Sequence, residues 1–181
     1  MTIRTPDQGP SVSRPDDQEI GKWYPRLFRT ALRLTGRYDD AADLTQQAFS
    51  KALAAWESFD GGNLRTTWLH QILINCVRDW ARRSAVRAAG PLHECELHLA
   101  DGVGTDGAAR MEAEEELAAL RAAVGDLPPP TRCAFVMTVL DGYSYRQAAE
   151  ILAVPEGTIA SRVHQARERL RATVRGRFEE V

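Results

Sequence analysis

The sequence predicts an all-α protein: two small helical domains joined by a flexible acidic linker, the second containing a helix-turn-helix. Apolar residues recur at spacings of three and four along most of the chain, which is the period of an amphipathic helix. No stretch shows sustained two-residue alternation with β-branched residues, so strands are not expected. Between the two helical regions the chain is rich in glycine and acidic residues, a composition typical of a linker.

These patterns divide the chain into four segments. Residues 1–18 are rich in Pro, Asp, Gln and Ser with almost no apolar content, so we expect a disordered tail. Residues 19–90 are expected to form the first helical domain, residues 91–112 the linker and residues 113–178 the second domain. The chain has 181 residues, which lies near the boundary between one domain and two. Its apolar runs are too short for membrane insertion, and no signal peptide is evident, so we expect a cytoplasmic protein.

The first domain is predicted to contain three helices. Apolar stripes at helical spacing cover residues 24–34, 41–56 and 68–80. Gly36 is expected to end the first helix, and Asp39 or Asp40 to cap the second. Trp68 and Trp80 could serve as stacking platforms for bases, but their apolar spacing favours packing in the core.

The second domain contains the helix-turn-helix pattern. Thr131 is expected to cap a helix that runs to Leu140. Ser144 and Gln147 then have the spacing of a capping box, and Pro155 suits the first position of the next helix. In that last helix a buried seam is predicted at Ile159, Val163, Ala166, Leu170 and Val174.

The opposite face of the last helix is polar and basic, as in a recognition helix that enters the major groove of DNA. Arginines at its margins are expected to contact phosphates, and its small polar residues to face base edges. The alternative interpretation is an ordinary helical hairpin that does not bind DNA. His164 is either a base-reading residue or a solvated surface histidine. The candidate DNA-facing residues are Thr158, Ala160, Ser161, Arg162, His164, Gln165 and Arg167.

Charge is segregated along the chain although the net charge is only -2. Residues 61–90 carry five arginines against one aspartate, and residues 144–177 carry seven arginines against three glutamates. Residues 91–126 between them carry nine acids and two arginines. Two basic blocks separated by an acidic one favour two contacts with a polyanion, although solvated helix faces would have similar composition.

Both halves resemble one protein family, the extracytoplasmic-function group of bacterial sigma factors within the sigma-70 family. The resembling stretches are residues 31–36, 43–49, 68–75, 127–128, 141–145, 148–152, 154–162 and 166–171. The resemblance covers about residues 20–178, in family order. It implies an RNA polymerase sigma factor, not an enzyme, that directs core polymerase to specific promoters in a stress or signal response.

The resemblance assigns the first domain to core RNA polymerase and to the promoter -10 element. The implied polymerase-binding residues are Asp43, Leu44, Gln46, Gln47 and Phe49. Gln47 stands where a glutamate is usual, which removes a charge from this contact. The implied -10 residues, which would hold a flipped base and a basic path for the strand, are Phe59, Gly62, Asn63, Asn75, Arg78, Arg82 and Arg83.

The second domain is implied to bind the promoter -35 element. Ala160 and Gln165 stand where basic residues are frequent, so the -35 preference of other members does not transfer. An anti-sigma factor is the expected regulatory partner, because both DNA-facing surfaces are basic and no upstream domain masks them. Folding back of the acidic linker is the competing form of restraint.

Two other function classes fit the sequence less well. A response-regulator type of transcription factor needs an α/β domain upstream, which the strandless first half disfavours. A small metal-dependent enzyme would need ligands among the four histidines, and no H-E-x-x-H pattern is present. We therefore expect no metal and no cofactor. Cys76 and Cys133 fall on apolar helix faces, as buried thiols do, whereas a redox role for Cys95 stays open.

Overall fold

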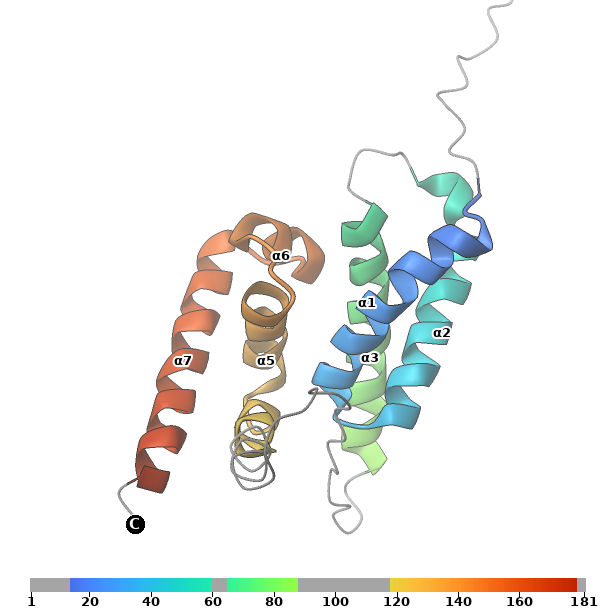
Figure 1. Cartoon of the computed structure of the whole chain (residues 1–181). Coiled ribbons are helices and arrows are strands. Elements are labelled where there is room, and N and C mark those ends of the chain that lie inside the picture. Colours follow the sequence, from blue (N-terminus) through green and yellow to red (C-terminus); the bar gives the residue numbers. More distant parts are fainter. Residues whose placement is uncertain (1–13, 60–64, 88–117, 179–181) are drawn as a thin grey trace, which may run out of the picture.

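The computed structural model describes residues 14–59, 65–87 and 118–178, and every regular element in them is a helix (Figure 1). The first unit contains α1 (Asp17–Thr35), α2 (Tyr38–Ala54), η1 (Trp56–Ser58) and α3 (Arg65–Arg87). The second contains α5 (Pro129–Phe135), η2 (Val136–Leu140), α6 (Tyr145–Leu152) and α7 (Glu156–Phe178), preceded by helical residues 118–125. The all-α prediction with two helical units is confirmed. The linker over residues 91–112 lies outside the described residues.

Helix α1 begins earlier than the sequence suggested. The side chain of Asp16 accepts a hydrogen bond from the backbone N–H of Glu19 at 2.7 Å, which caps the helix. Residues 17 and 18 therefore belong to α1 rather than to the expected tail, of which residues 1–13 lie outside the described residues. The helix ends at Gly36, whose φ of 75° is the left-handed conformation expected there.

The predicted cap of α2 is wrong. Arg37 occupies the N-cap position with extended backbone and makes no side-chain cap bond. Asp39 and Asp40 lie instead in the first turn, where the helix dipole favours acidic residues. The Asp40 carboxylate accepts a hydrogen bond from the Trp80 indole at 3.1 Å, so it joins α2 to α3 rather than capping α2.

The helix that ends before the helix-turn-helix also begins differently from the prediction. Pro128 is the N-cap of α5, and Pro129 and Pro130 fill its first turn, where a missing N–H costs nothing. Thr131 is buried inside the helix, so its predicted capping role is wrong. After Phe135 the chain widens into the π-helical turn η2, which ends at Leu140 with Asp141 as its C-cap.

The helix-turn-helix has most of the features that the sequence predicts. Ser144 and Gln147 form both bonds of the predicted capping box. At the turn, Ala153 adopts a left-handed conformation with a φ of 52°. Pro155 precedes α7, which starts at Glu156, so Pro155 is not the first helical residue as predicted.

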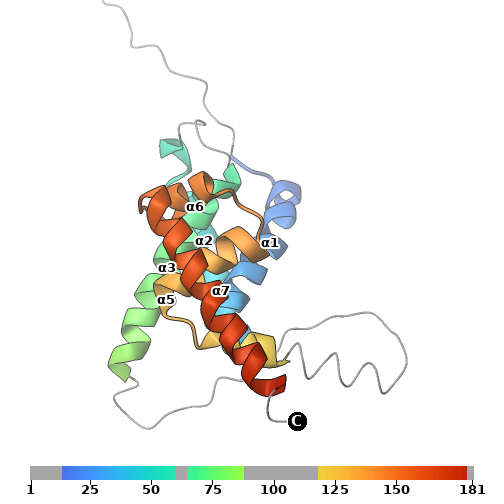
Figure 2. The ribbon, with the colours of Figure 1, turned by 90° about the vertical axis from the view of Figure 1, so that its left-hand side faces the viewer.

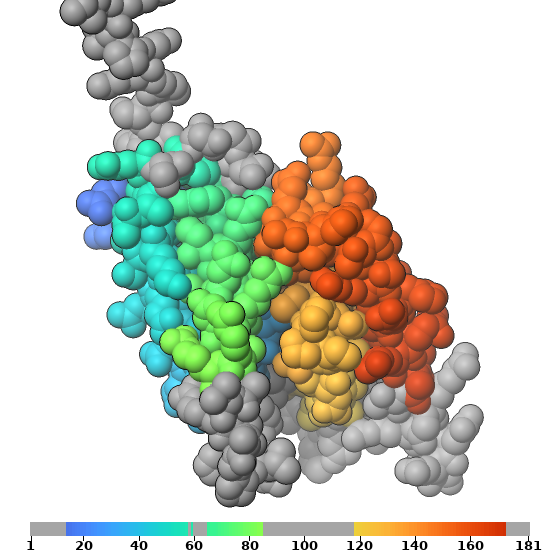
Figure 3. Space-filling model, turned by 180° about the vertical axis from the view of Figure 1, so that it is seen from behind, coloured from blue at the N-terminus to red at the C-terminus, as the bar shows by residue number. Residues whose placement is uncertain are grey.

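The two units share one apolar core. A single cluster of buried residues runs from Leu27 and Leu73 of the first unit to Met137, Ile151 and Val163 of the second. A smaller cluster around Leu127, Phe135 and Leu170 lies within the second unit. Figure 3 shows the surface of α3 in contact with that of α6. The units therefore pack directly against each other, an arrangement that the sequence patterns did not reveal.

Candidate nucleic-acid interface

Helix α7 presents a polar face to solvent and buries the opposite one. Ile159, Val163 and Ala166 have no exposed surface, and Leu170 is 8% exposed, which confirms those four positions of the predicted seam. Figure 2 shows α7 on the outside of the molecule. Of the candidate DNA-facing residues, the exposed ones are Ala160, Ser161, His164, Gln165 and Arg167, and the half-buried ones are Thr158 and Arg162.

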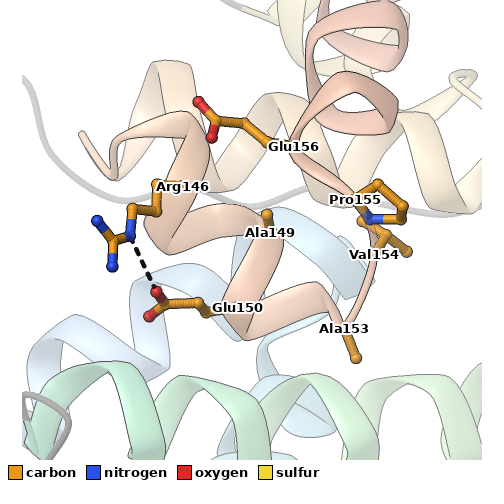
Figure 4. Close-up of a pocket in the computed structure, with 7 residues that line it drawn as sticks. All are labelled: Arg146, Ala149, Glu150, Ala153, Val154, Pro155 and Glu156. Atoms are coloured by element: carbon orange, nitrogen blue, oxygen red, sulfur yellow. Dashed lines mark ion pairs between the residues drawn. The ribbon is translucent and has the colours of Figure 1, made fainter.

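An open hollow lies where α6 turns into α7 (Figure 4). Its lining residues are Arg146, Ala149, Glu150, Ala153, Val154, Pro155 and Glu156. Arg146 forms an ion pair with Glu150 at 3.5 Å across one turn of α6. Because two carboxylates face one already paired guanidinium, this hollow does not favour an anion such as phosphate.

The candidate polymerase-binding residues of α2 divide into two sets. Asp43, Gln46 and Gln47 are exposed on the outer face of the helix. Leu44 is only 1% exposed and Phe49 only 9%, and both belong to the shared core. In this structure these two residues therefore pack inside the fold and hold α2 in place, and their implied role in polymerase binding stays a prediction.

The turn expected to hold a flipped base lies partly outside the described residues, since Gly62 and Asn63 fall in the range 60–64. Phe59 is 7% exposed and packs against Trp56 and Trp68, at 5.9 and 5.0 Å between ring centroids. Its side chain therefore packs in the core, and its implied contact with a -10 base stays a prediction. Trp68 belongs to the same aromatic cluster, as its apolar spacing favoured.

One face of α3 carries most of the other -10 candidates, spaced three and four residues apart. Asn75, Arg78 and Arg82 lie along this face and Arg83 lies beside it, and all four are exposed. The Arg78 guanidinium does not point freely into solvent, because its Nη2 donates to the backbone carbonyl of Leu152 at 2.6 Å. One turn of helix before Asn75, the Gln71 amide donates to the carbonyl of Glu150 at 3.0 Å. The end of α6 therefore covers part of this face.

A buried polar network joins the two units, and the sequence analysis did not identify it. His70 has no exposed surface; its Nδ1 lies 2.7 Å from the Thr66 carbonyl and 3.0 Å from the Tyr143 hydroxyl. The Thr30 hydroxyl lies 3.3 Å from His70 Nε2 and donates to the Asp141 carboxylate at 2.7 Å. His70 lies three residues before Leu73, a helical spacing that predicts burial, but nothing local in the sequence points to its partners.

Burial shifts the acid–base properties of this network. Desolvation lowers the pKa of His70 below its ordinary value, although the Thr66 carbonyl and the Asp141 carboxylate favour the protonated ring. Burial likewise raises the pKa of the Tyr143 hydroxyl. The imidazole is therefore held neutral at neutral pH, as a structural hydrogen-bonding group.

Cys76 and Cys133 are buried free thiols, as their position on apolar faces predicted. Burial raises the pKa of the Cys133 thiol, which disfavours its reactive thiolate form. Cys95 lies outside the described residues. Within the residues that the structure describes, no three His, Cys, Asp or Glu side chains gather as a metal site would require. No helix in the same part of the chain is long and apolar enough to span a membrane.

Comparison with known proteins places both units in one family. The family model for sigma-70 region 2 matches residues 20–87, and the model for sigma-70 region 4 matches residues 117–170. These ranges coincide with the α1–α3 unit and with the unit that contains the helix-turn-helix.

Three similar proteins are sigma factors. The ECF RNA polymerase sigma factor EcfG of Rhodopseudomonas palustris is 37% identical over 150 residues, which cover 82% of this chain and 78% of that protein. The ECF RNA polymerase sigma factor SigE of Mycolicibacterium smegmatis is 31% identical over 157 residues, which cover 86% of this chain but only 60% of that protein. The sigma factor RpoE of Bartonella quintana, solved in complex with the anti-sigma factor NepR, matches with a TM-score of 0.70 at 30% identity. That match covers 87% of this chain and 95% of the other. The chain therefore belongs to the sigma-70 family, and within it to the extracytoplasmic-function sigma factors that direct RNA polymerase to promoters.

Proposed function

We propose that this protein is a non-catalytic initiation factor that binds core RNA polymerase through the exposed face of α2 and contacts promoter DNA through α3 and α7. It would act in the cytoplasm, where polymerase and promoters are. The observation that carries the proposal is the placement of α7. A capped α6 and a left-handed turn hold it with a fully buried seam, and its polar face lies open on the outside of the molecule.

The proposed -35 contact follows from the side chains of that face. Ser161, His164 and Gln165 offer hydrogen-bonding groups to base edges, and Arg167 lies beside them, where it would reach a phosphate. Arg162 is half-buried at the margin, which supports a positioning contact with the backbone rather than a base contact.

The proposed polymerase contact uses Asp43, Gln46 and Gln47, since Leu44 and Phe49 are buried. Replacing Gln46 by arginine changes this face without disturbing the core, whereas a charge at Leu44 would unfold the helix bundle. The matched control is Ala54→Arg, an exposed position two turns further along α2.

The test is run-off transcription with purified core polymerase, together with co-purification of the two. The wild-type chain should give transcripts with defined 5′ ends that core polymerase alone does not give. Gln46→Arg should weaken core binding by at least about tenfold, because an unpaired charge enters a protein interface. Equal core binding by Gln46→Arg and Ala54→Arg would rule out this face of α2. No promoter-specific transcript from any template would rule out the function itself.

We further propose that an anti-sigma factor restrains this chain. RpoE of Bartonella quintana, similar along 87% of this chain, was solved with the anti-sigma factor NepR. Purified NepR of Bartonella quintana, added in excess, should therefore reduce the run-off transcripts. Full transcription in the presence of a stable complex would contradict this role.

A further inference from the structure

Two polar side chains, Ser161 and Gln165, lie one turn apart on the outer face of α7. The buried seam of this helix fixes the direction of that face, since Ile159, Val163 and Ala166 have no exposed surface. With about 3.6 residues per turn, Ser161 lies opposite the centre of the seam, and Gln165 lies slightly to one side on the next turn. Both residues are exposed. They are therefore among the side chains that would reach deepest into a groove of DNA.

Charged residues limit the part of this face that can contact bases. Arg162 is half-buried and Arg167 is exposed, and the helical period puts them on opposite sides of the line through Ser161. From there, two guanidiniums would reach the phosphates on either side of a groove. Two turns after Ser161, on the same line, the Glu168 carboxylate accepts from the Arg171 guanidinium at 2.7 Å. Because an acid disfavours close approach to the DNA backbone, base contacts are confined to the earlier turns of α7.

The hydroxyl proton of Ser161 already has an acceptor. Its Oγ donates to the backbone carbonyl of Thr158, one turn earlier, at 3.1 Å. A hydroxyl has one donor and two acceptor lone pairs, so this bond leaves Ser161 as an acceptor. Donating to a base would break the bond to Thr158, whereas accepting from a base keeps it. In the major groove only the exocyclic amines of adenine and cytosine donate. Ser161 therefore favours a base that presents such an amine to it.

The side-chain amide of Gln165 selects more narrowly. It presents an acceptor oxygen and an NH2 donor side by side at an exposed position. Adenine presents the N6 amine next to the N7 acceptor, so the amide can make two hydrogen bonds to it at once. Guanine presents two acceptors, O6 and N7, which match the two parallel donors of a guanidinium rather than an amide. Adenine is therefore the base that satisfies both groups of Gln165.

We propose that α7 reads an adenine through Gln165 and, close to it in the -35 element, the exocyclic amine of an adenine or cytosine through Ser161. Residues four apart are separated by about 6 Å along a helix, and base pairs by about 3.4 Å along B-DNA. The two side chains can thus meet neighbouring base pairs or pairs one step further apart. This inference rests on the proposed contact of α7 with the -35 element and specifies which bases that contact selects.

The first experiment selects promoter fragments of randomised sequence with core polymerase carrying the full chain. The wild-type chain should select an A·T pair at one -35 position by at least about fivefold, and Gln165→Ala should lose that preference. Gln165→Arg should select guanine in place of the adenine on the same strand, because a guanidinium donates to both O6 and N7. Ser161→Ala should lose a preference at a second position, where the wild-type chain separates adenine and cytosine from guanine and thymine on one strand.

The matched control is Ala122→Arg, which adds the same charge as Gln165→Arg at an exposed position outside α7. It should change the affinity for all sequences alike and leave the -35 preference unchanged, because charge alone acts through the phosphates.

The second experiment removes single groups from the selected bases. At the Gln165 position, 7-deazaadenine lacks the N7 acceptor and unsubstituted purine lacks the N6 amine. Each should weaken binding by the wild-type holoenzyme and leave binding by Gln165→Ala unchanged. At the Ser161 position, an analogue without the exocyclic amine should weaken binding by the wild-type holoenzyme and leave binding by Ser161→Ala unchanged.

Selection of a G·C pair at the position that depends on Gln165, or an unchanged preference in Gln165→Arg, would overturn the assignment of adenine. Equal binding of the wild-type holoenzyme with and without the amine would overturn the role of Ser161. In both cases a preferred -35 sequence would remain, so the proposed function would stand. If core polymerase with the bound chain selected no -35 sequence at all, the proposed promoter contact of α7 would fail, and this inference with it.

Discussion

Helices α3 and α7 are alike in sequence terms and differ in what surrounds them. Each has 23 residues, and each carries arginines expected to meet DNA. Helix α7 lies on the outside, with five of its seven candidate residues exposed. Helix α3 belongs to the first unit and faces α6. Its four described candidates are also exposed, but α6 covers the neighbouring Gln71 and engages the Arg78 guanidinium. The basic face of α7 is therefore open, whereas that of α3 is partly occupied by α6. This difference comes from the packing of the two units and not from the sequences of the helices.

The largest expected effect tests whether the two helices belong to one cooperative core. Leu73 on α3 and Ile159 on α7 are both fully buried in the shared cluster. Leu73→Ala and Ile159→Ala should each lower the free energy of unfolding by about 2–5 kcal/mol, because each leaves a cavity. Denaturant titration followed by circular dichroism should show one transition that both substitutions shift. Two transitions, each sensitive to only one substitution, would show that the units fold independently.

A smaller expected effect distinguishes His70, which is buried on α3, from His164, which is exposed on α7. The pKa of His70 is lowered by burial, so between that lowered value and about 6.5 the unfolded chain binds a proton that the folded chain does not. The free energy of unfolding should therefore fall as pH drops below about 6.5, by at most about 1.4 kcal/mol per pH unit.

Burial is the largest cause of the lowered pKa of His70; the Thr66 carbonyl and the Asp141 carboxylate raise this pKa, and the Arg26 guanidinium lowers it. The Tyr143 and Thr30 hydroxyls also contact the ring. His70→Gln should remove this part of the pH dependence, and His164→Gln on the outer face of α7 is the control. Urea unfolding at pH 7.5, 6.5 and 5.5 provides the measurement. An unchanged slope in His70→Gln would mean that other groups carry the pH dependence.

The smallest effect compares one arginine from each helix. Arg167→Ala should weaken DNA binding by the free chain several-fold at all sequences and reduce the salt slope by about one, because one phosphate contact is lost. Arg78→Ala should change binding by the free chain less, since its guanidinium already donates to Leu152. Binding isotherms between 50 and 200 mM salt measure both slopes. Equal losses in the two variants would mean that α3 is as available to DNA as α7.

Local signals in the sequence correctly predicted what depends on neighbours along the chain. The capping box at Ser144, the left-handed end at Gly36 and the buried seam of α7 follow from bonds and spacings within a few residues. Even there, the predicted caps at Asp39 or Asp40 and at Thr131 were wrong. Arg37 and Pro128 occupy the N-cap positions of these helices instead.

Motif resemblance alone assigned residues to contacts without regard to their depth in the fold. Leu44 and Phe49 of the polymerase motif, and Phe59 of the -10 turn, are core residues, because the helices that flank them close over these side chains. A motif records which residue types occur together, and it does not separate those that make a contact from those that hold the contact in place.

By itself, the sequence determined the helices, their capping box, the helix-turn-helix and the membership of both halves in one family, because each rests on a local pattern. Tertiary structure alone decided that Asp141 meets Thr30 and Arg33, that Tyr143 meets His70, and that α6 covers part of α3. Those pairs are separated by 73 to 111 residues and leave no period or spacing in the chain. They arise because the apolar faces of the two units exclude water most fully when they are buried against each other.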